Sequence, residues 1–394
     1  MSLSAGVGRL VAALDAAFPT NLVPVLRGFL QEHGGARSVT VYVADYDLLR
    51  LRALPDGDPA NAADSFPVDG SQPGRAFRAQ TPTLQDRGDS VVVHLPVSVR
   101  AERVGVLSVE LAEGPTPELL DGLAQAAAAV AYAILNAQHY TDVIERARRE
   151  RPMVLPAELQ WGLLPRRAYT CPQFALAGQL VPAYEVGGDL FDYAVDVDEV
   201  VLTVTDAMGH GLQASLLASL GVGALRNARR TGLSLADQVR FADRVLYGQF
   251  GGEQFVTALA VAIHLRSGQA RIVNAGHPGL WLKRGAQIRR LDVVAQLPMG
   301  LFEATRYVEQ PVTLHPGDRL VLVSDGVLEA QGGGNDPYGE QRLEGAILAT
   351  ATLAPDETVR QLVRLLLDYQ GDELRDDATV LCLDWHGSSG SAGA

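Results

Sequence analysis

The chain has 394 residues, 47% of them hydrophobic and 20% charged, with a net charge of −13 at pH 7. At roughly 150 residues per domain, this length predicts two or three globular domains, each with an apolar core. Net negative charge disfavours a nucleic-acid partner, because the phosphate backbone binds cationic surfaces. The two cysteines, Cys171 and Cys382, are too few for a disulfide framework or a thiolate zinc site, which favours a reduced, cytoplasmic setting.

We expect no membrane partner. Arg9, Asp15 and Pro19 interrupt every apolar run near the N-terminus, so no secretory signal is predicted there. The most apolar internal stretch, residues 126–135, is about half as long as the roughly 20 residues of a membrane span.

The first part of the chain predicts an antiparallel sheet with flanking helices. Apolar residues recur at three- and four-residue steps over 7–18 and 22–31, which predicts two helices separated by Pro19-Thr20-Asn21. Alternating β-branched and aromatic residues predict strands at 38–43, 48–54, 91–97 and 103–111.

A long helix is expected to begin at Thr116-Pro117-Glu118, with Thr116 as the N-cap and Pro117 at the first helical position. Its apolar stripe runs from Leu119 toward Val143. Two interpretations stay open: the stripe packs on its own domain's sheet, or it forms a parallel dimer seam that carries a signal.

The composition divides the chain into four parts. Residues 1–140 form the first domain, and residues 141–165, with Pro152, Pro156 and Pro165, form a helical linker. Residues 166–385 hold glycine-punctuated strands and form the second domain. Residues 386–394 are rich in glycine and serine and predict a disordered tail.

Aspartates gather at four places in the second domain, each beside an apolar strand-like run. They are Asp189 and Asp192 after Gly187-Gly188, Asp206 after 200–205, Asp325 after 319–324, and Asp376-Asp377 before 378–383. A single Asp-Gly after a strand is most often a turn. Four such clusters together predict a metal centre, because buried carboxylates repel one another unless cations neutralise them.

Oxygen ligands without clustered His or Cys indicate hard ions, Mg²⁺ or Mn²⁺. Two ions that share a carboxylate activate a water and clamp phosphate oxygens, so the pattern predicts hydrolysis of phosphate esters. No G-x-S-x-G elbow or phosphate-binding P-loop motif indicates acyl transfer or nucleotide hydrolysis.

Residues 159–383 resemble the SpoIIE-type serine phosphatase family, the bacterial branch of the metal-dependent type 2C (PPM) protein phosphatases. Eight ordered blocks carry the resemblance: Leu159-Gln160 with Leu163-Leu164-Pro165; Pro182-Ala183 with Glu185-Val186-Gly187-Gly188-Asp189-Leu190-Phe191-Asp192; Asp206-Ala207-Met208-Gly209-His210-Gly211; Phe255-Val256-Thr257-Ala258; Asn274-Ala275-Gly276-His277-Pro278; Pro298-Met299-Gly300; Pro316-Gly317-Asp318 to Ala330; and Asp376-Asp377-Ala378-Thr379.

The resemblance implies an α+β fold whose second domain is a β-sandwich of two antiparallel sheets flanked by helices, with two Mn²⁺ or Mg²⁺ ions at one end. It makes Asp189 and Asp206 ligands, with Asp206 bridging and the carbonyl of Ala207 available to one ion. Asp325 and Asp376 would complete the other site. The implied substrate is phosphoserine or phosphothreonine on a phosphorylated antagonist-type regulatory protein, in a partner-switching pathway that controls an alternative sigma factor.

This chain departs from the family pattern at three positions without losing a carboxylate: Thr205 stands where glycine is usual, Ala207 follows Asp206, and Leu328 stands where threonine is common. Other polar residues of these motifs keep two interpretations. Asp192 and Asp377 are either hydrogen-bond partners that orient the ligands or solvated turn residues. His210 and His277 are either acid groups or structural residues, and the structural role is favoured.

Residues 1–140 resemble a GAF sensor domain through the strand order and the segments Val68-Asp69-Gly70, Gly74-Arg75-Ala76-Phe77 and Gln80-Thr81-Pro82. The resemblance implies a possible small-molecule ligand, a regulatory role and a homodimer. Two other functions stay open: a catalytically silent scaffold that binds its partner, and a phosphatase of small metabolites.

Overall fold

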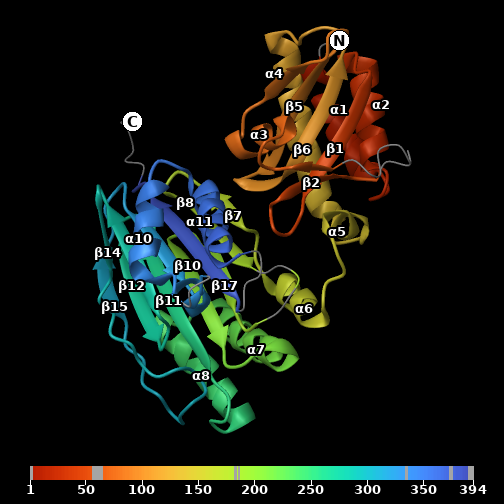
Figure 1. The fold of residues 1–394 in the computed structure, drawn as a ribbon. Helices are drawn as coiled ribbons and strands as arrows, with labels where there is room; N and C mark the ends of the chain where they lie inside the picture. The colour runs from red at the N-terminus through yellow and green to blue at the C-terminus, as the bar shows by residue number, and fades with distance from the viewer. Residues whose placement is uncertain are drawn as a thin grey trace. The chain divides into compact units, whose positions relative to one another are not determined.

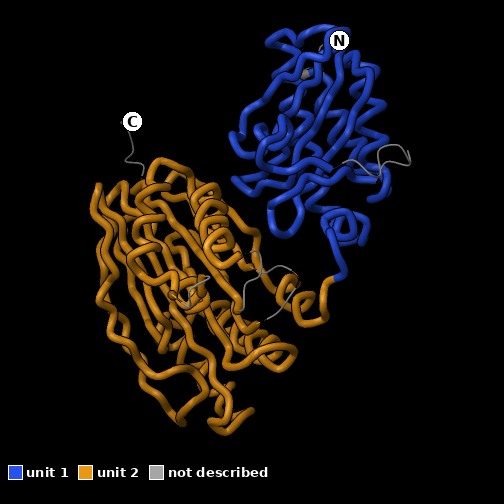
Figure 2. The backbone as a smooth tube through the Cα atoms, viewed as in Figure 1, with its two compact units in different colours: residues 1–152 blue, residues 153–394 orange. Residues whose placement is uncertain are grey.

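The computed structural model describes residues 3–55, 65–181, 184, 187–332, 336–371 and 376–388. Four residues of the second motif block, Pro182, Ala183, Glu185 and Val186, lie outside this set, as does 389–394 of the predicted tail. The chain divides into two compact units, residues 1–152 and 153–394 (Figure 2). The predicted linker, 141–165, is divided between them.

Unit 1 is built on one antiparallel sheet with the strand order β3-β2-β1-β6-β5-β4 (Figure 1). Its strands are β1 (Ser38–Ala44), β2 (Arg50–Ala53), β3 (Ser65–Pro67), β4 (Thr83–Asp86), β5 (Val91–Val99) and β6 (Glu102–Leu111). All four predicted strands are confirmed. The sequence did not predict β3 and β4, because strands of three or four residues are too short to show an alternating pattern.

Helices cover both faces of this sheet. They are α1 (Leu3–Ala16), α2 (Leu22–Gly34), α3 (Gln72–Ala79), α4 (Pro117–Ala137) and α5 (Val143–Arg148). The buried side chains of α1, α2 and α4 share one core with β1, β5 and β6. On the opposite face, Phe77 of α3 is buried against Tyr42, Leu51 and Val106. The helix-and-sheet arrangement expected for the first domain is therefore present.

The long helix α4 begins as predicted, with the Thr116 hydroxyl accepting a hydrogen bond from Leu119 N at 3.2 Å. It ends at Ala137, earlier than the expected continuation toward Val143. Leu123, Val130 and Ile134 of its stripe are fully buried in the core of its own unit, and Leu119 is partly buried against the same core. The packing interpretation is thus confirmed, and the same side chains are not available for a dimer seam.

By length and composition, α4 is also apolar enough to cross a membrane. Its buried stripe accounts for that composition, because core helices of globular domains carry the same apolar residues.

Unit 2 is a sandwich of two antiparallel sheets, with strand orders β15-β12-β11-β10-β9 and β14-β13-β16-β17-β8-β7 (Figure 1). The strands are β7 (Ala168–Thr170), β8 (Phe174–Val181), β9 (Leu190–Val195), β10 (Glu199–Ala207), β11 (Val256–His264), β12 (Gln269–Ala275), β13 (Gly279–Arg284), β14 (Gln287–Arg290), β15 (Gln310–Thr313), β16 (Arg319–Val323) and β17 (Ala378–Trp385). Leucine and valine side chains from both sheets form one core between them. The expected α+β class and the β-sandwich are confirmed.

The helices of unit 2 are α6 (Leu155–Leu163), α7 (Gly211–Arg230), α8 (Leu235–Phe250), α9 (Asp325–Glu329), α10 (Gly339–Ala349) and α11 (Pro355–Gln370). Helices α7 and α8 pack on the outer face of the five-stranded sheet. Helix α11 packs on β8 and β17 of the six-stranded sheet, and α6 contacts α7. The helices thus flank the sandwich on both sides, as the resemblance implied.

Candidate metal centre

The antiparallel topology brings the predicted carboxylates to one end of the sandwich. Asp189 stands directly before β9, and Asp206 lies near the end of β10. Because these strands pair antiparallel, both residues lie at the same end of the sheet. In the other sheet, Asp325 follows β16 and Asp376 precedes β17, which also pair antiparallel. The negative charge of Asp325 raises the pKa of Asp206, so the carboxylates of the two sheets are close enough to form one site.

Three glycines allow the backbone segments of this site to approach closely. A Cβ atom on Gly187 would lie 2.5 Å from the Asp377 carboxyl carbon, and one on Gly188 would lie 2.3 Å from the Ala207 carbonyl oxygen. A Cβ on Gly326 would lie 1.8 Å from the Asp377 carbonyl oxygen. A larger residue would displace the Asp377 side chain at Gly187 and a neighbouring backbone at Gly188 and Gly326, which explains the glycines of the motifs.

Asp189 is only 2% exposed. The fully buried Ser324 hydroxyl accepts a hydrogen bond from Thr379 N at 2.9 Å, and its own proton can be donated to the Asp189 carboxylate. The other oxygen, Asp189 Oδ2, is buried and accepts no hydrogen bond from the described residues. An unsatisfied buried carboxylate oxygen is costly and indicates that a cation belongs beside it.

Burial and mutual repulsion both disfavour negative charge in this cluster. Burial raises the pKa of Asp189 well above its usual value, and the charges of Asp206, Asp377 and Asp325 raise it further. Burial, followed by the charges of Asp325 and Asp376, raises the pKa of Asp206 to about 7. Bound cations remove this penalty, because they favour the ionised form of each carboxylate.

The last pair of aspartates divides into one exposed and one buried side chain. Asp376 is exposed, and its Oδ1 accepts a hydrogen bond from Asp377 N at 2.9 Å. Asp377 is buried, and its Oδ2 accepts a hydrogen bond from Gly187 N at 2.8 Å. Of the two interpretations of Asp377, the structure favours a hydrogen-bond partner that holds the loop before Asp189.

Gln160 of α6 is a site residue whose role the sequence did not predict. Its side chain is buried, and Nε2 lies 2.9 Å from the Gly187 carbonyl oxygen, 3.0 Å from the Asp189 carbonyl oxygen and 3.3 Å from Asp377 Oδ2. The available signal was a glutamine within a short apolar helix, in the first block of the resemblance. A buried amide needs polar partners, and here they are the backbone beside Asp189 and the carboxylate of Asp377.

Asp192 lies outside the cluster, and both interpretations of it were wrong. It is buried in β9, and its carboxylate forms ion pairs with Arg226 at 2.8 Å and Arg229 at 3.0 Å. The two arginines belong to α7, so Asp192 fastens that helix to the sheet.

The two motif histidines occupy different environments. His277 is buried: Nδ1 lies 3.0 Å from the Thr257 hydroxyl, and Nε2 lies 3.1 Å from the Val323 carbonyl oxygen. Burial lowers the pKa of His277 to about 4, so its ring is neutral at pH 7 and supports the loops around it. His210 is an exposed residue at the N-cap of α7 and forms no side-chain cap hydrogen bond.

The donor set fits hard divalent cations, since it consists of carboxylate and carbonyl oxygens. In the described part of the chain, no three His, Cys, Asp or Glu side chains converge to enclose one ion. A small number of protein ligands per ion agrees with the coordination of Mg²⁺, which usually binds through one or two carboxylates and retains several waters.

A β-sandwich flanked by helices, with buried carboxylates at one end of both sheets, is the architecture expected for the metal-dependent type 2C phosphatase class. Residues 196–386 match the family model described as stage II sporulation protein E (SpoIIE). The match covers 196–386, which lie within unit 2, so this part of the chain is similar to the SpoIIE phosphatase domain.

Two proteins of Bacillus subtilis (strain 168) are similar to part of the chain. Phosphoserine phosphatase RsbU is 26% identical over 208 residues, which cover 52% of this chain and 61% of RsbU. Phosphoserine phosphatase RsbP is 27% identical over 150 residues, which cover 37% of each protein. The chain therefore spans less than two thirds of the length of either relative.

Solved structures also resemble part of the chain. The RsbU and RsbW domains of Rv1364c from Mycobacterium tuberculosis have a TM-score of 0.49 at 25% identity, covering 55% of this chain and 61% of that one. The SiaA-PP2C domain of Pseudomonas aeruginosa has a TM-score of 0.48 at 24% identity, covering 66% of this chain and 99% of that one.

Proposed function

We propose that this protein is a metal-dependent serine/threonine protein phosphatase. The observation that carries the proposal is the cluster of Asp189, Asp206, Asp325 and Asp377, in which burial, followed by the charges of neighbouring carboxylates, raises every carboxyl pKa. Such a cluster is unfavourable by itself and becomes favourable with bound cations. The match of 196–386 to the SpoIIE family model supports the same activity.

In this proposal Asp189, Asp206, Asp325 and Asp376 hold two Mn²⁺ or Mg²⁺ ions, with the Ala207 carbonyl as a further ligand. Such ions, when bound, supply an activated water and neutralise the oxygens of a phosphate ester. The chain's own residues orient that chemistry. The Ser324 hydroxyl fixes one oxygen of Asp189, which leaves Oδ2 directed to the cation.

Asp377 and Gln160 hold the backbone that carries Asp189. Asp377 Oδ2 accepts a hydrogen bond from Gly187 N, and Gln160 Nε2 donates to the carbonyl oxygens of Gly187 and Asp189. The backbone from Gly187 to Asp189, directly before β9, is therefore held at both ends. Residues of this kind position the ligands and contact no substrate, and replacing them commonly costs about 10- to 100-fold in metal affinity or activity.

The finer proposal concerns substrate and setting. We propose that the substrate is phosphoserine or phosphothreonine on an antagonist-type regulatory protein, in the cytoplasm, and that the chain acts as a homodimer. Two relatives named phosphoserine phosphatases, RsbU and RsbP, support the chemistry of the substrate. The GAF-like unit 1 would regulate the enzyme, with or without a small ligand.

Helix α6 supports a route for this regulation. It follows unit 1 in the chain and carries Gln160, so a rotation or register shift of α6 would move the loop that holds Asp189. Leu163 packs partly buried in the core under α7. Polar substitutions at Leu159 and Leu163 should therefore change activity and metal dependence, and unchanged values for both would remove this route.

The test of the activity is hydrolysis of p-nitrophenyl phosphate and of a phosphoserine peptide with Mn²⁺, Mg²⁺ or EDTA. We expect turnover that requires metal and falls by at least about 100-fold in Asp206→Asn and in Asp325→Asn. Asp198→Asn is the matched control, because Asp198 is an exposed carboxylate of the same unit, paired with Arg266 at 3.0 Å. It should keep full activity.

Other outcomes select the alternative functions. Turnover of p-nitrophenyl phosphate without turnover of any phosphoprotein would favour a phosphatase of small metabolites. Metal-dependent binding of a partner without turnover, in both the full chain and residues 153–394, would favour the silent scaffold. Turnover by the fragment 153–394 without turnover by the full chain would mean that unit 1 holds the enzyme inactive.

A further inference from the structure

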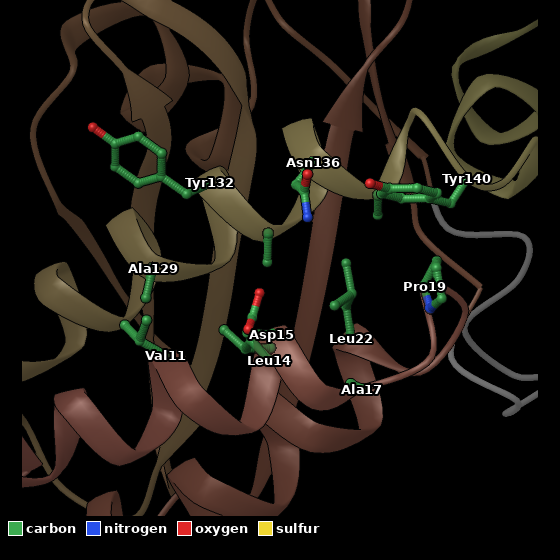
Figure 3. A pocket seen from close by; sticks show the side chains of 12 residues that line it. Val11, Leu14, Asp15, Ala17, Pro19, Leu22, Ala129, Tyr132, Asn136 and Tyr140 are labelled. Atoms are coloured by element: carbon green, nitrogen blue, oxygen red, sulfur yellow. The ribbon is translucent and has the colours of Figure 1, made fainter.

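A cavity of about 380 Å³ opens at the surface of unit 1, whereas the carboxylate cluster belongs to unit 2. It is formed by α1, the turn that leads into α2, and the second half of α4 with the residues that follow it (Figure 3). Its volume lies in the range of small-molecule sites, about 300 to 1,000 Å³. It lies among α1, α2 and α4, on the face of the sheet opposite to the face that α3 covers.

Three polar side chains face the middle of this cavity. In Figure 3 the Asp15 carboxylate at the end of α1 and the Asn136 amide near the end of α4 point toward each other, and the Tyr140 hydroxyl points into the same space. These three side chains form no hydrogen bond or ion pair with any residue that the structure describes. Convergent polar groups in a concave surface are the feature that fixes the orientation of a ligand.

The charge of the cavity favours a cation. Its 12 lining residues include one carboxylate, Asp15, and no lysine, arginine or histidine. A ligand cation there gains a charge-assisted hydrogen bond to Asp15, and a ligand anion would be repelled. Tyr132 and Tyr140 line the two ends, and aromatic rings attract cations through their negative faces.

The remaining wall is apolar. Leu14 and Leu22 form the floor of the cavity, and Val11 and Ala129 lie at the end near Tyr132 (Figure 3). Leu14 and Leu22 are themselves buried, so this wall is set by the packing of the core. A ligand with a short apolar body would therefore gain contact area beside its charged group.

From this arrangement we propose that unit 1 binds a small organic cation, an amine or quaternary ammonium compound with a short apolar body, whose charge lies at Asp15. The ligand links α1 to the end of α4, and its binding stabilises the helical layer of unit 1. The proposal concerns unit 1 alone and does not depend on the phosphatase activity.

The test is calorimetric titration of the full-length protein with three probes of one shape: phenethylamine as the cation, phenethyl alcohol as the neutral analogue, and phenylacetate as the anion. We expect saturable binding of phenethylamine and at least about tenfold weaker binding of the other two. Asp15→Asn should weaken phenethylamine binding by about tenfold and bring it to the level of the alcohol. Tyr140→Phe should cause a smaller loss.

The matched control is Asp121→Asn, which removes a carboxylate from α4 outside the cavity, where Asp121 accepts a hydrogen bond from Gln125 at 2.7 Å. It should bind phenethylamine as the unmodified chain does. Three results would overturn the proposal: no saturable binding of phenethylamine at millimolar concentration, equal binding of the alcohol, or equal binding by Asp15→Asn. A further result would also overturn the proposal: the chain forms a dimer that does not bind phenethylamine, and Tyr132→Ser dissociates this dimer. A second copy would then cover the cavity.

Discussion

Gln160 Nε2 lies 3.0 Å from the carbonyl oxygen of Asp189, and both groups are buried. The same nitrogen reaches Gly187 O and Asp377 Oδ2, so one side chain of α6 connects two segments that are 190 residues apart in the sequence. The position of Asp189 therefore depends on α6 as well as on its own strand.

Replacing Gln160 with leucine should lower phosphatase activity by about 10- to 100-fold and raise the Mn²⁺ concentration needed for half-maximal activity. Leucine removes the donor that contacts the carbonyl oxygens of Gly187 and Asp189, which loosens the residues directly before β9. The measurement is activity against Mn²⁺ concentration, because a simple loss of folded protein lowers the maximum without shifting the metal requirement. Gln287→Leu, at an exposed position of β14, is the control and should match the unmodified chain.

Gly326→Ala should reduce activity by about 100-fold, because its Cβ would lie 1.8 Å from the carbonyl oxygen of Asp377 and would displace that segment. Gly345→Ala is the comparison: Gly345 lies on an exposed face of α10 with no atom within 4 Å of the added carbon. That change should leave activity intact and stabilise the helix by about 0.5 to 1 kcal/mol. Equal activity in the two variants would contradict the close packing described at the site.

The sequence predicted the features of this structure that depend on residues close together in the chain. The strands β1, β2, β5 and β6, the N-cap at Thr116 and the aspartates at the ends of apolar strands follow from spacing alone. The role of Gln160 did not, because its partner Asp377 is 217 residues away. Asp192 was misjudged for the same reason, since its partners lie on a helix 34 and 37 residues further along the chain.

Asp192→Asn should destabilise unit 2 by about 3 kcal/mol, because it leaves Arg226 and Arg229 without their buried counter-charge. Chemical denaturation of the full chain measures this loss. Below the unfolding transition the variant should keep its metal requirement and most of its activity, unlike Asp206→Asn. A stable variant with an altered metal requirement would instead place Asp192 at the metal centre.

The stability of unit 1 should fall as the pH is lowered from about 6.5 toward 4. Burial, followed by the positive charge of Arg87, lowers the pKa of His94 to about 4, whereas an unfolded histidine titrates near 6.5. In this window the unfolded chain binds a proton that the folded chain does not, so the free energy of unfolding decreases as the pH falls. Above pH 6.5 the contribution is fully present.

His94→Gln should remove part of this pH dependence, on the order of 1 to 2 kcal/mol between pH 6.5 and 4. Glutamine keeps a polar group near Ser108, which lies 2.7 Å from His94 Nδ1, without a titrating ring. Denaturation of the variant and of the unmodified chain across this range measures the difference, and the exposed His139→Gln serves as control. Parallel curves for His94→Gln and the unmodified chain would contradict the assignment.

Calorimetric titration of the full chain with Mn²⁺, beside Asp206→Asn, tests whether the carboxylate cluster binds metal. The carboxylate cluster predicts saturable binding of two ions per chain, and loss or strong weakening of that binding in Asp206→Asn, with the fold retained. No Mn²⁺ binding by the unmodified chain, or equal binding by Asp206→Asn, would contradict a metal centre at these residues and the phosphatase mechanism that depends on it.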